Sequence, residues 1–234
     1  MKQFKSTGKY WFLLMIISTL MMVLAYRGIC NGTITNLFSV YGVAIGDVVV
    51  IGLIVPVVSL LLLKVINDCM LSSRMLAFGS RSAWWQTVKK KIRKQCLGSG
   101  VLLLLPVFLM ANVTMKIQTI VEWIYILFLF FTIFMFFYLI ALCIAFMEIK
   151  FQQNTLTFCF VMFLSYLPNI AAFLFRQTGI PQISGCLNLS YAFDGKNFYW
   201  FQCEKVCVVM LLLLLLLENT CRVLVKKHNI FGKM

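Results

Sequence analysis

Few side chains in this sequence could perform chemistry. His228 is the single histidine among 234 residues, so a histidine-based zinc site has one ligand available. Cys221 lies seven residues earlier, which on a helix is about 10 Å and too far for direct proton transfer to the imidazole. Cys203 and Cys207 lack the second pair that a tetrahedral metal site requires. We therefore expect neither a catalytic residue nor a metal site in this chain.

The chain also lacks the residues needed to bind and hydrolyse ATP by itself. A phosphate-binding loop reads Gly-x-x-x-x-Gly-Lys-Ser/Thr and follows a strand, whereas residues 6–9 (Ser-Thr-Gly-Lys) supply only a fragment of it. We expect no cofactor in this chain. An ATP-dependent activity would need a separate subunit that carries ATP and Mg²⁺.

The distribution of apolar residues predicts the secondary-structure elements that position these residues. Apolar side chains make up 62% of the chain and come in long blocks, whereas soluble domains contain about 45–50%. Such blocks are typical of helices in lipid, because each helix must cover a hydrocarbon core of about 30 Å. The sequence predicts an all-α polytopic membrane protein in one domain, with six transmembrane helices at about residues 10–26, 48–66, 97–115, 123–147, 155–175 and 206–225.

The placement of basic residues predicts the orientation of these spans. Lys and Arg concentrate in cytoplasmic loops, so the more basic side is the inner side. With the N-terminus inside, 16 of the 21 Lys and Arg lie on the inner side, and both termini are cytoplasmic. The net charge of +14 therefore indicates topology and lipid headgroups rather than nucleic acid. The five basic residues left outside are Arg27, Lys116, Arg176, Lys196 and Lys205.

Two pairs of residues have a spacing that indicates a contact. Glu218 and Arg222 lie four residues apart in the last span, on one helical face, and can form an ion pair. This pair either has a function within the membrane or anchors the helix at the interface. Cys186 and Cys203 lie in the predicted outer loop, residues 176–205, where an oxidising environment permits a disulfide. Free thiols are the alternative.

Residues 67–96 form the predicted cytoplasmic loop between the second and third spans, and they are the most basic part of the chain. Ser80 or Ser82 can cap a short helix there. Trp84 and Trp85 then fall on or near one face, with basic residues on the other. Such a helix is typical of a membrane–water interface and also fits a groove on a partner protein. A loop that only sets topology and binds headgroups is the alternative.

The stretch from Arg74 to Lys90 contains the pattern Arg-x-x-x-x-Gly-Ser-Arg-x-x-Trp-Trp-x-x-x-Lys. With six spans and a small cytoplasmic N-terminus, the chain resembles the permease subunits of type-2 ABC exporters. The stretch itself resembles that of the small permeases of bacteriocin and lantibiotic immunity systems. In that family the stretch forms a coupling helix that docks on the ATP-binding subunit. The resemblance implies that this partner contacts Arg74, Ser80, Arg81, Trp84, Trp85 and Lys89.

From this resemblance we expect the permease subunit of an ATP-driven exporter, which moves or extracts a hydrophobic cargo such as an antimicrobial peptide or a lipid-like molecule. The implied partners are an ATP-binding subunit, a second permease (the same chain or another) and the lipid bilayer. The expected location is the bacterial plasma membrane, and the chain itself is not expected to be an enzyme. The alternative is a stand-alone membrane immunity or scaffold protein that acts without ATP.

Overall fold

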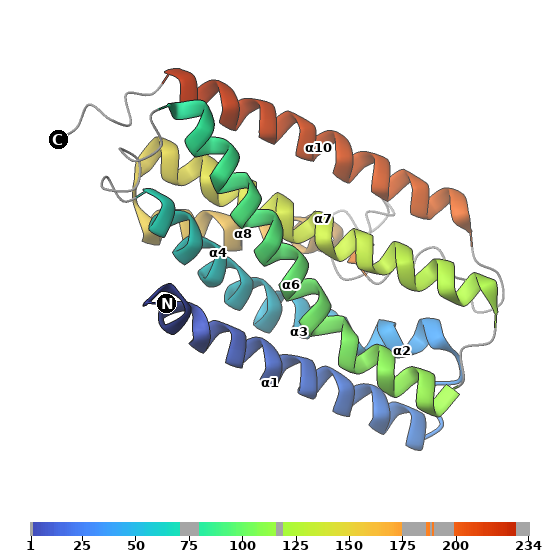
Figure 1. Cartoon of the computed structure of the whole chain (residues 1–234). Helices are drawn as coiled ribbons and strands as arrows, with labels where there is room; N and C mark the ends of the chain where they lie inside the picture. The colour runs from blue at the N-terminus through green and yellow to red at the C-terminus, as the bar shows by residue number, and fades with distance from the viewer. Residues whose placement is uncertain are drawn as a thin grey trace.

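The computed structural model describes residues 2–70, 80–115, 119–174, 186–187, 189 and 199–227. Within these residues the secondary structure is helical and contains no strand, as the sequence predicts. The long helices lie side by side in an elongated bundle (Figure 1). In chain order the elements are α1 (Lys2–Cys30), α2 (Leu37–Ala44), α3 (Asp47–Val49), the π-helical turn η1 (Val50–Ile54), α4 (Val55–Met70), α6 (Arg81–Met115), α7 (Ile120–Phe151), α8 (Asn154–Leu174) and α10 (Trp200–Lys227).

Five helical segments are long and apolar enough to cross a membrane. They are α1, the continuous segment Asp47–Met70, α6, α7 and α10. In α8 the apolar stretch Asn154–Leu167 is shorter. The protein is therefore an all-α membrane protein. Each predicted span coincides with a helix, and most helices continue past the predicted ends.

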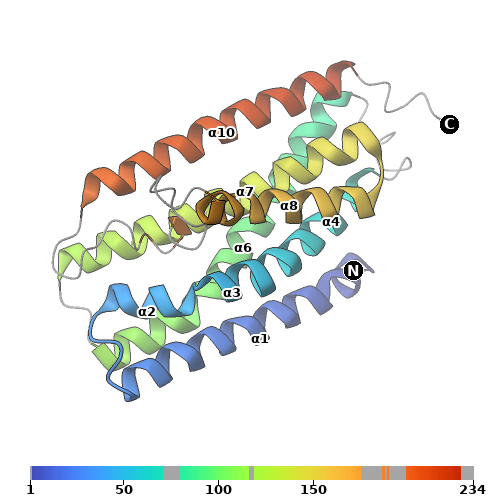
Figure 2. The same cartoon turned by 180° about the vertical axis from the view of Figure 1, so that it is seen from behind.

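Consecutive long helices run in opposite directions, so the start of α1 and the end of α10 lie at the same end of the bundle (Figures 1 and 2). A hydrogen bond at this end joins the start of α6 to the end of α10: Nη1 of Arg81 donates to the carbonyl of Lys226 at 2.9 Å. We call this end the basic end. The opposite end has Arg27 and Lys205 among the described basic residues, whereas the basic end has Lys9, Lys64, Arg81, Lys89, Lys90, Lys91, Arg93, Lys94, Lys150, Arg222 and Lys226.

The predicted loop at residues 67–96 is largely helical where the structure describes it. Residues 67–70 complete α4, and residues 81–96 form the first turns of α6, which continues without a break into the predicted third span. In these residues the predicted coupling helix is thus the extension of a spanning helix and not a separate element. Arg74, with the rest of residues 71–79, lies outside the described residues.

Two sequence features explain why α6 begins so early. Ser80 caps the helix, because its Oγ accepts a hydrogen bond from the backbone N–H of Ala83 at 3.2 Å. The next turns then carry an apolar stripe at helical spacing, which packs into the bundle instead of lying on a membrane surface. This buried stripe consists of Trp84, Trp85, Val88 and Ile92.

Two local elements do not follow from the hydrophobic blocks. The short helix α2 begins at an N-cap, where Oδ1 of Asn36 accepts a hydrogen bond from the backbone N–H of Ser39 at 2.8 Å. The π-turn η1 ends two residues before Pro56, whose ring lacks an N–H and crowds the preceding turn of a helix. A wider turn accommodates this proline inside a membrane-crossing segment.

The helices α1 and α6 approach each other closely. Oγ of Ser18 donates a buried hydrogen bond to the carbonyl of Leu103 at 3.1 Å. A Cβ atom placed on Gly98 would lie 2.8 Å from Cη2 of Trp11, which is closer than real Cβ contacts. Small residues at helix contacts are the usual way for membrane helices to approach. Gly98 therefore sets the distance between α1 and α6.

We predict that Gly98→Leu destabilises the bundle by about 1–3 kcal/mol, because an overpacked side chain must displace Trp11. The measurement is the free energy of unfolding in detergent, followed by circular dichroism. Gly42→Leu is the matched control, because a Cβ atom placed on this helical glycine would have no atom within 4 Å. Equal effects of the two substitutions would contradict the close approach at Gly98.

Candidate functional site

Polar side chains from three helices, three of which are charged, meet at the basic end. Nζ of Lys89 in α6 lies 2.7 Å from Oε1 of Glu218 in α10, and Nη2 of Arg93 lies 3.5 Å from the other carboxylate oxygen. Tyr138 in α7 donates its hydroxyl to Oε2 of Glu218 at 3.2 Å and accepts from Nε of Arg93 at 3.3 Å. We call Lys89, Arg93, Tyr138 and Glu218 the basic junction.

The junction is sheltered from solvent to different degrees. The side chain of Lys89 is 13% exposed and that of Glu218 is 26% exposed, whereas Arg93 is 53% exposed. An ion pair in a sheltered site is screened less than a surface pair, and removal of one partner leaves the other uncompensated. Lys89 and Glu218 therefore fasten α6 to α10, and Arg93 adds a weaker, more exposed contact.

The spacing of four residues predicts an ion pair between Glu218 and Arg222. In the structure Glu218 instead pairs with Lys89 and Arg93 of α6. The spacing identifies neighbours on one helix, but it does not reveal that α6 packs beside α10 and brings Lys89 closer. Arg222 instead lines a pocket of about 250 Å³ next to the junction. The other lining residues are Gln86, Lys89, Leu215, Glu218 and Asn219.

Trp84 and Trp85 lie in the core and do not project from the basic end. Their side chains are 1% and 3% exposed, respectively. Nε1 of Trp84 donates to the carbonyl of Cys69 at 2.9 Å, which fastens α6 to α4. A partner protein could not use these buried rings as anchors without first opening the bundle. On the first turns of α6 the exposed residues are Ser82, Ala83, Gln86, Lys90, Arg93 and Lys94.

Arg93 and Tyr138 belong to the junction, although neither was a predicted site residue. The signal for Tyr138 is a hydroxyl within a block of Phe, Leu and Ile, because a polar group in hydrocarbon requires a hydrogen-bond partner. Glu218 gives a similar signal, since a carboxylate inside an apolar block requires a cation. A basic face on a neighbouring helix is the natural source of that cation, and α6 provides it.

Cys186 and Cys203 are free thiols in the structure, and the disulfide between them stays a prediction. Cys203 is fully buried in the core, whereas Cys186 lines a pocket between α7, α8 and α10. Burial raises the pKa of the Cys186 thiol to about 11, so at neutral pH this residue is almost entirely protonated. Because the thiolate is the species that reacts, this shift in pKa disfavours the reactive form of Cys186.

Among the described residues, no group of three or more His, Cys, Asp or Glu side chains is arranged to hold a metal ion. His228 lies outside the described residues. In comparisons with known proteins, no family model, curated protein or solved structure matches this chain. We therefore infer the function from the arrangement of the side chains at the basic end.

We predict that three substitutions at the basic end lower the free energy of unfolding by different amounts, with Glu218→Gln the largest and Lys90→Met the smallest. Glu218→Gln leaves Lys89 and Arg93 without a counter-ion and should lower the free energy of unfolding by about 1.5–3 kcal/mol. Lys89→Met should cost less, because Arg93 and Tyr138 still contact Glu218. Lys90→Met is the control, since this neighbouring lysine is exposed.

Denaturation in detergent measures all three variants and the double variant Lys89→Met, Glu218→Gln. The two substitutions should be non-additive, because the residues are in direct contact. Additive effects, or a Lys90→Met variant as unstable as Lys89→Met, would show that the junction does not hold α6 to α10.

Proposed function

We propose that this chain is the membrane-spanning permease subunit of an ATP-driven exporter and that an ATP-binding subunit docks on the basic end. One observation carries the proposal: the start of α6 is fastened to two other helices. Trp84 bonds the end of α4, Arg81 bonds the end of α10, and Lys89 pairs with Glu218 of α10. A partner that pushes here acts on three spanning helices together.

The length of α6 supports transmission of such a push across the bilayer. Its 35 residues form one helix about 50 Å long, which extends beyond a hydrocarbon core of about 30 Å. Movement of its start therefore tilts or shifts the whole helix. Pro106 lies inside α6 and removes one backbone hydrogen bond, which gives the helix a place to bend. Coupling through packed, rigid elements of this kind can link distant sites.

In this proposal α8 is the sixth span, since its 21 residues measure about 31 Å as a helix. The basic end then faces the cytoplasm of a bacterium, because Lys and Arg favour that side. A second permease, identical or different, completes the translocation path. The cargo is hydrophobic or amphipathic, such as an antimicrobial peptide or a lipid-like molecule, because apolar side chains dominate the helices.

The docking surface consists of the exposed face of α6, with Ser82, Lys90 and Lys94, and not the buried tryptophans. Two exposed lysines on successive turns favour a partner surface with acidic side chains. Arg81 and Lys89 have a different role here: they hold α6 in place beneath the docking surface.

We predict that Lys90→Glu and Lys94→Glu each reduce binding of the ATP-binding subunit at least tenfold, because charge reversal opposes an acidic partner. The tagged chain is purified from its host in mild detergent, and the co-purified protein is assayed for ATP hydrolysis and export. Arg27→Glu is the matched control, since it reverses an exposed charge at the opposite end.

The proposal fails if the parent chain confers its activity while no ATP-hydrolysing protein accompanies it. That result would favour the stand-alone immunity or scaffold protein, which binds its target without ATP. Equal loss of the partner in the Arg27→Glu variant would instead exclude docking at the basic end.

A further inference from the structure

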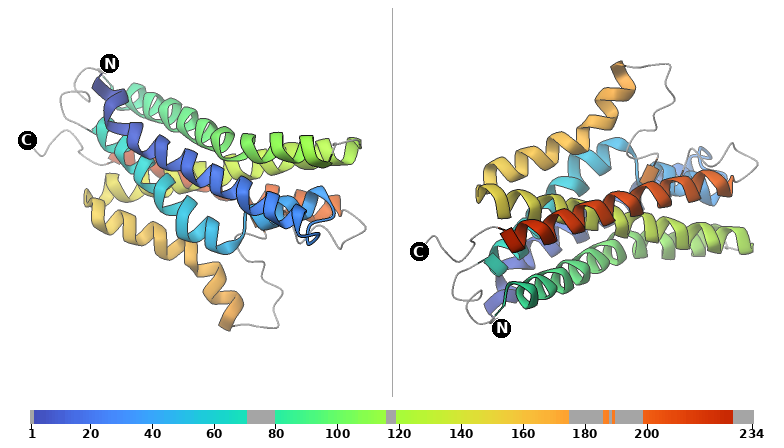
Figure 3. Two further views of the ribbon diagram at one scale, coloured as in Figure 1. Left: turned by 90° about the horizontal axis from the view of Figure 1, so that it is seen from below. Right: turned by 90° about the horizontal axis from the view of Figure 1, so that it is seen from above.

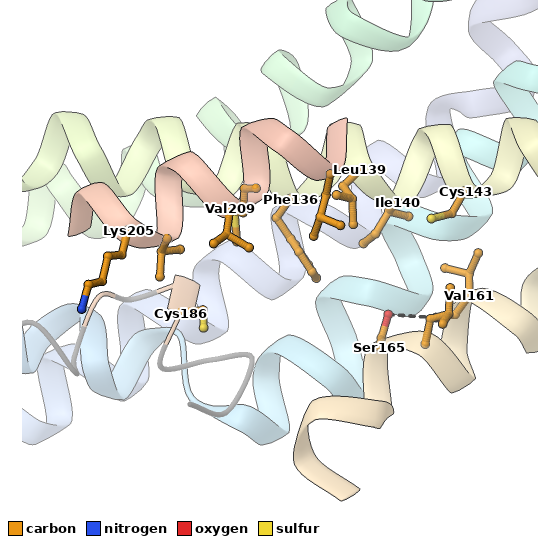
Figure 4. Close-up of a pocket in the computed structure, with 13 residues that line it drawn as sticks. Phe136, Leu139, Ile140, Cys143, Val161, Ser165, Cys186, Lys205 and Val209 are labelled. Carbon is orange, nitrogen blue, oxygen red and sulfur yellow. Dashed lines mark hydrogen bonds between the residues drawn. The ribbon is translucent and has the colours of Figure 1, made fainter. Parts of the chain in front are cut away.

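The helices α7, α8 and α10 enclose an apolar groove of about 470 Å³ (Figure 4). Both α8 and α10 pack on α7, and α8 leans away from the rest of the bundle (Figure 3). The volume lies within the range of about 300–1,000 Å³ that is usual for small-ligand sites. Representative lining residues are Phe136 and Ile140 from α7, Val161 from α8, and Val209 and Leu213 from α10.

A single charged residue, Lys205, is present among the described residues that line this groove. Its ammonium lies over the ring of Phe201, 4.5 Å from the ring centre. The hydroxyl of Ser165 is already satisfied, because it donates to the carbonyl of Val161 at 2.9 Å. The groove thus offers apolar walls and one cation, which matches the chemistry of an amphiphile with a negative headgroup.

The position of the groove along the bundle also fits such a molecule. Lys205 lies near the start of α10, at the end opposite the basic end, and the lining extends along this helix to Leu213. The eight residue steps from Lys205 to Leu213 correspond to about 12 Å along α10. On α7 the lining continues past Tyr138, which contacts Glu218, to Cys143, so the groove runs from the level of Lys205 towards the basic end. An acyl chain that covers half of a hydrocarbon core needs about 15 Å, and the groove is long enough for it.

A second hollow on the surface supplies a contrast. It has a volume of about 740 Å³ and is lined by residues of α6 and α7, including Leu97, Leu127 and Phe131. The described residues that line it carry no charge. Ordinary bilayer lipids can cover such a surface without selection for a headgroup, and this hollow therefore serves as the internal control.

We propose that the groove between α7, α8 and α10 binds a membrane lipid with an anionic headgroup. Its acyl chain lies along Ile140, Val161 and Val209, and its phosphate contacts the ammonium of Lys205. Charge complementarity at one interface and an apolar lining long enough for an acyl chain favour this occupant over a second copy of the chain. The site depends on the bundle alone and not on an ATP-binding partner.

Native mass spectrometry of the delipidated full chain tests the proposal with phosphatidylglycerol and phosphatidylcholine of equal acyl chains. One phosphatidylglycerol should bind about tenfold more tightly than phosphatidylcholine. Lys205→Gln should reduce this preference to twofold or less, because the ammonium no longer meets the phosphate. Arg27→Gln removes an exposed charge at the same end, away from the groove, and should leave the preference unchanged.

A second pair of variants tests the walls of the groove. Val209→Trp should fill it and abolish tight binding of phosphatidylglycerol, whereas Leu127→Trp, in the uncharged hollow, should leave that binding intact. Unchanged lipid affinity in Val209→Trp would overturn the proposal. A dimer that becomes monomeric in Val209→Trp, with lipid affinity preserved, would identify a second copy as the occupant.

Discussion

A charged side chain at the centre of a membrane helix costs about 2.5–3.5 kcal/mol. This cost explains where the charged side chains of the bundle lie. Most of the described cations gather at one end of the bundle, where α6 begins and α4, α7 and α10 end. Glu218 lies in a strongly apolar block, and its position is tolerable because Lys89 reaches it from α6 at 2.7 Å. The same pair joins α6 to α10, which packs mainly on α7.

The same cost concentrates the ion pairs between helices at one end of the bundle. At the basic end, hydrogen bonds and ion pairs join α4, α6, α7 and α10, and Asn67 of α4 also bonds Asn154 at the start of α8 at 2.7 Å. Towards the opposite end, α8 diverges and leaves an apolar groove against α7 and α10. There Nδ2 of Asn169 in α8 donates to Oδ1 of Asp47 in α3 at 3.4 Å, so a directional contact also holds α8 beyond the groove.

The sequence alone predicts most of the fold but little of the site. Long apolar blocks must be helical in lipid, because each backbone N–H and C=O needs a partner within its own segment. The sequence does not reveal which side chains from different helices contact each other. The stripe that contains Trp84 fits a groove on another protein or a groove in its own bundle, and only the contact with Cys69 distinguishes these cases. Glu218 likewise has Arg222 nearby in sequence and Lys89 nearby in space.

The helix α10 connects the basic junction to the groove, because it carries Glu218 and also forms one wall of the groove. It packs on α7 along its length and meets α6 as well, while much of its remaining surface faces outward. A displacement of α6 that shifts Glu218 therefore also moves Lys205 and Val209 relative to α8. If a partner docks at the basic end and a lipid binds in the groove, each must alter the affinity of the other by the same factor. A lipid in the groove would then be a component of the coupling and not a passive neighbour of the helix.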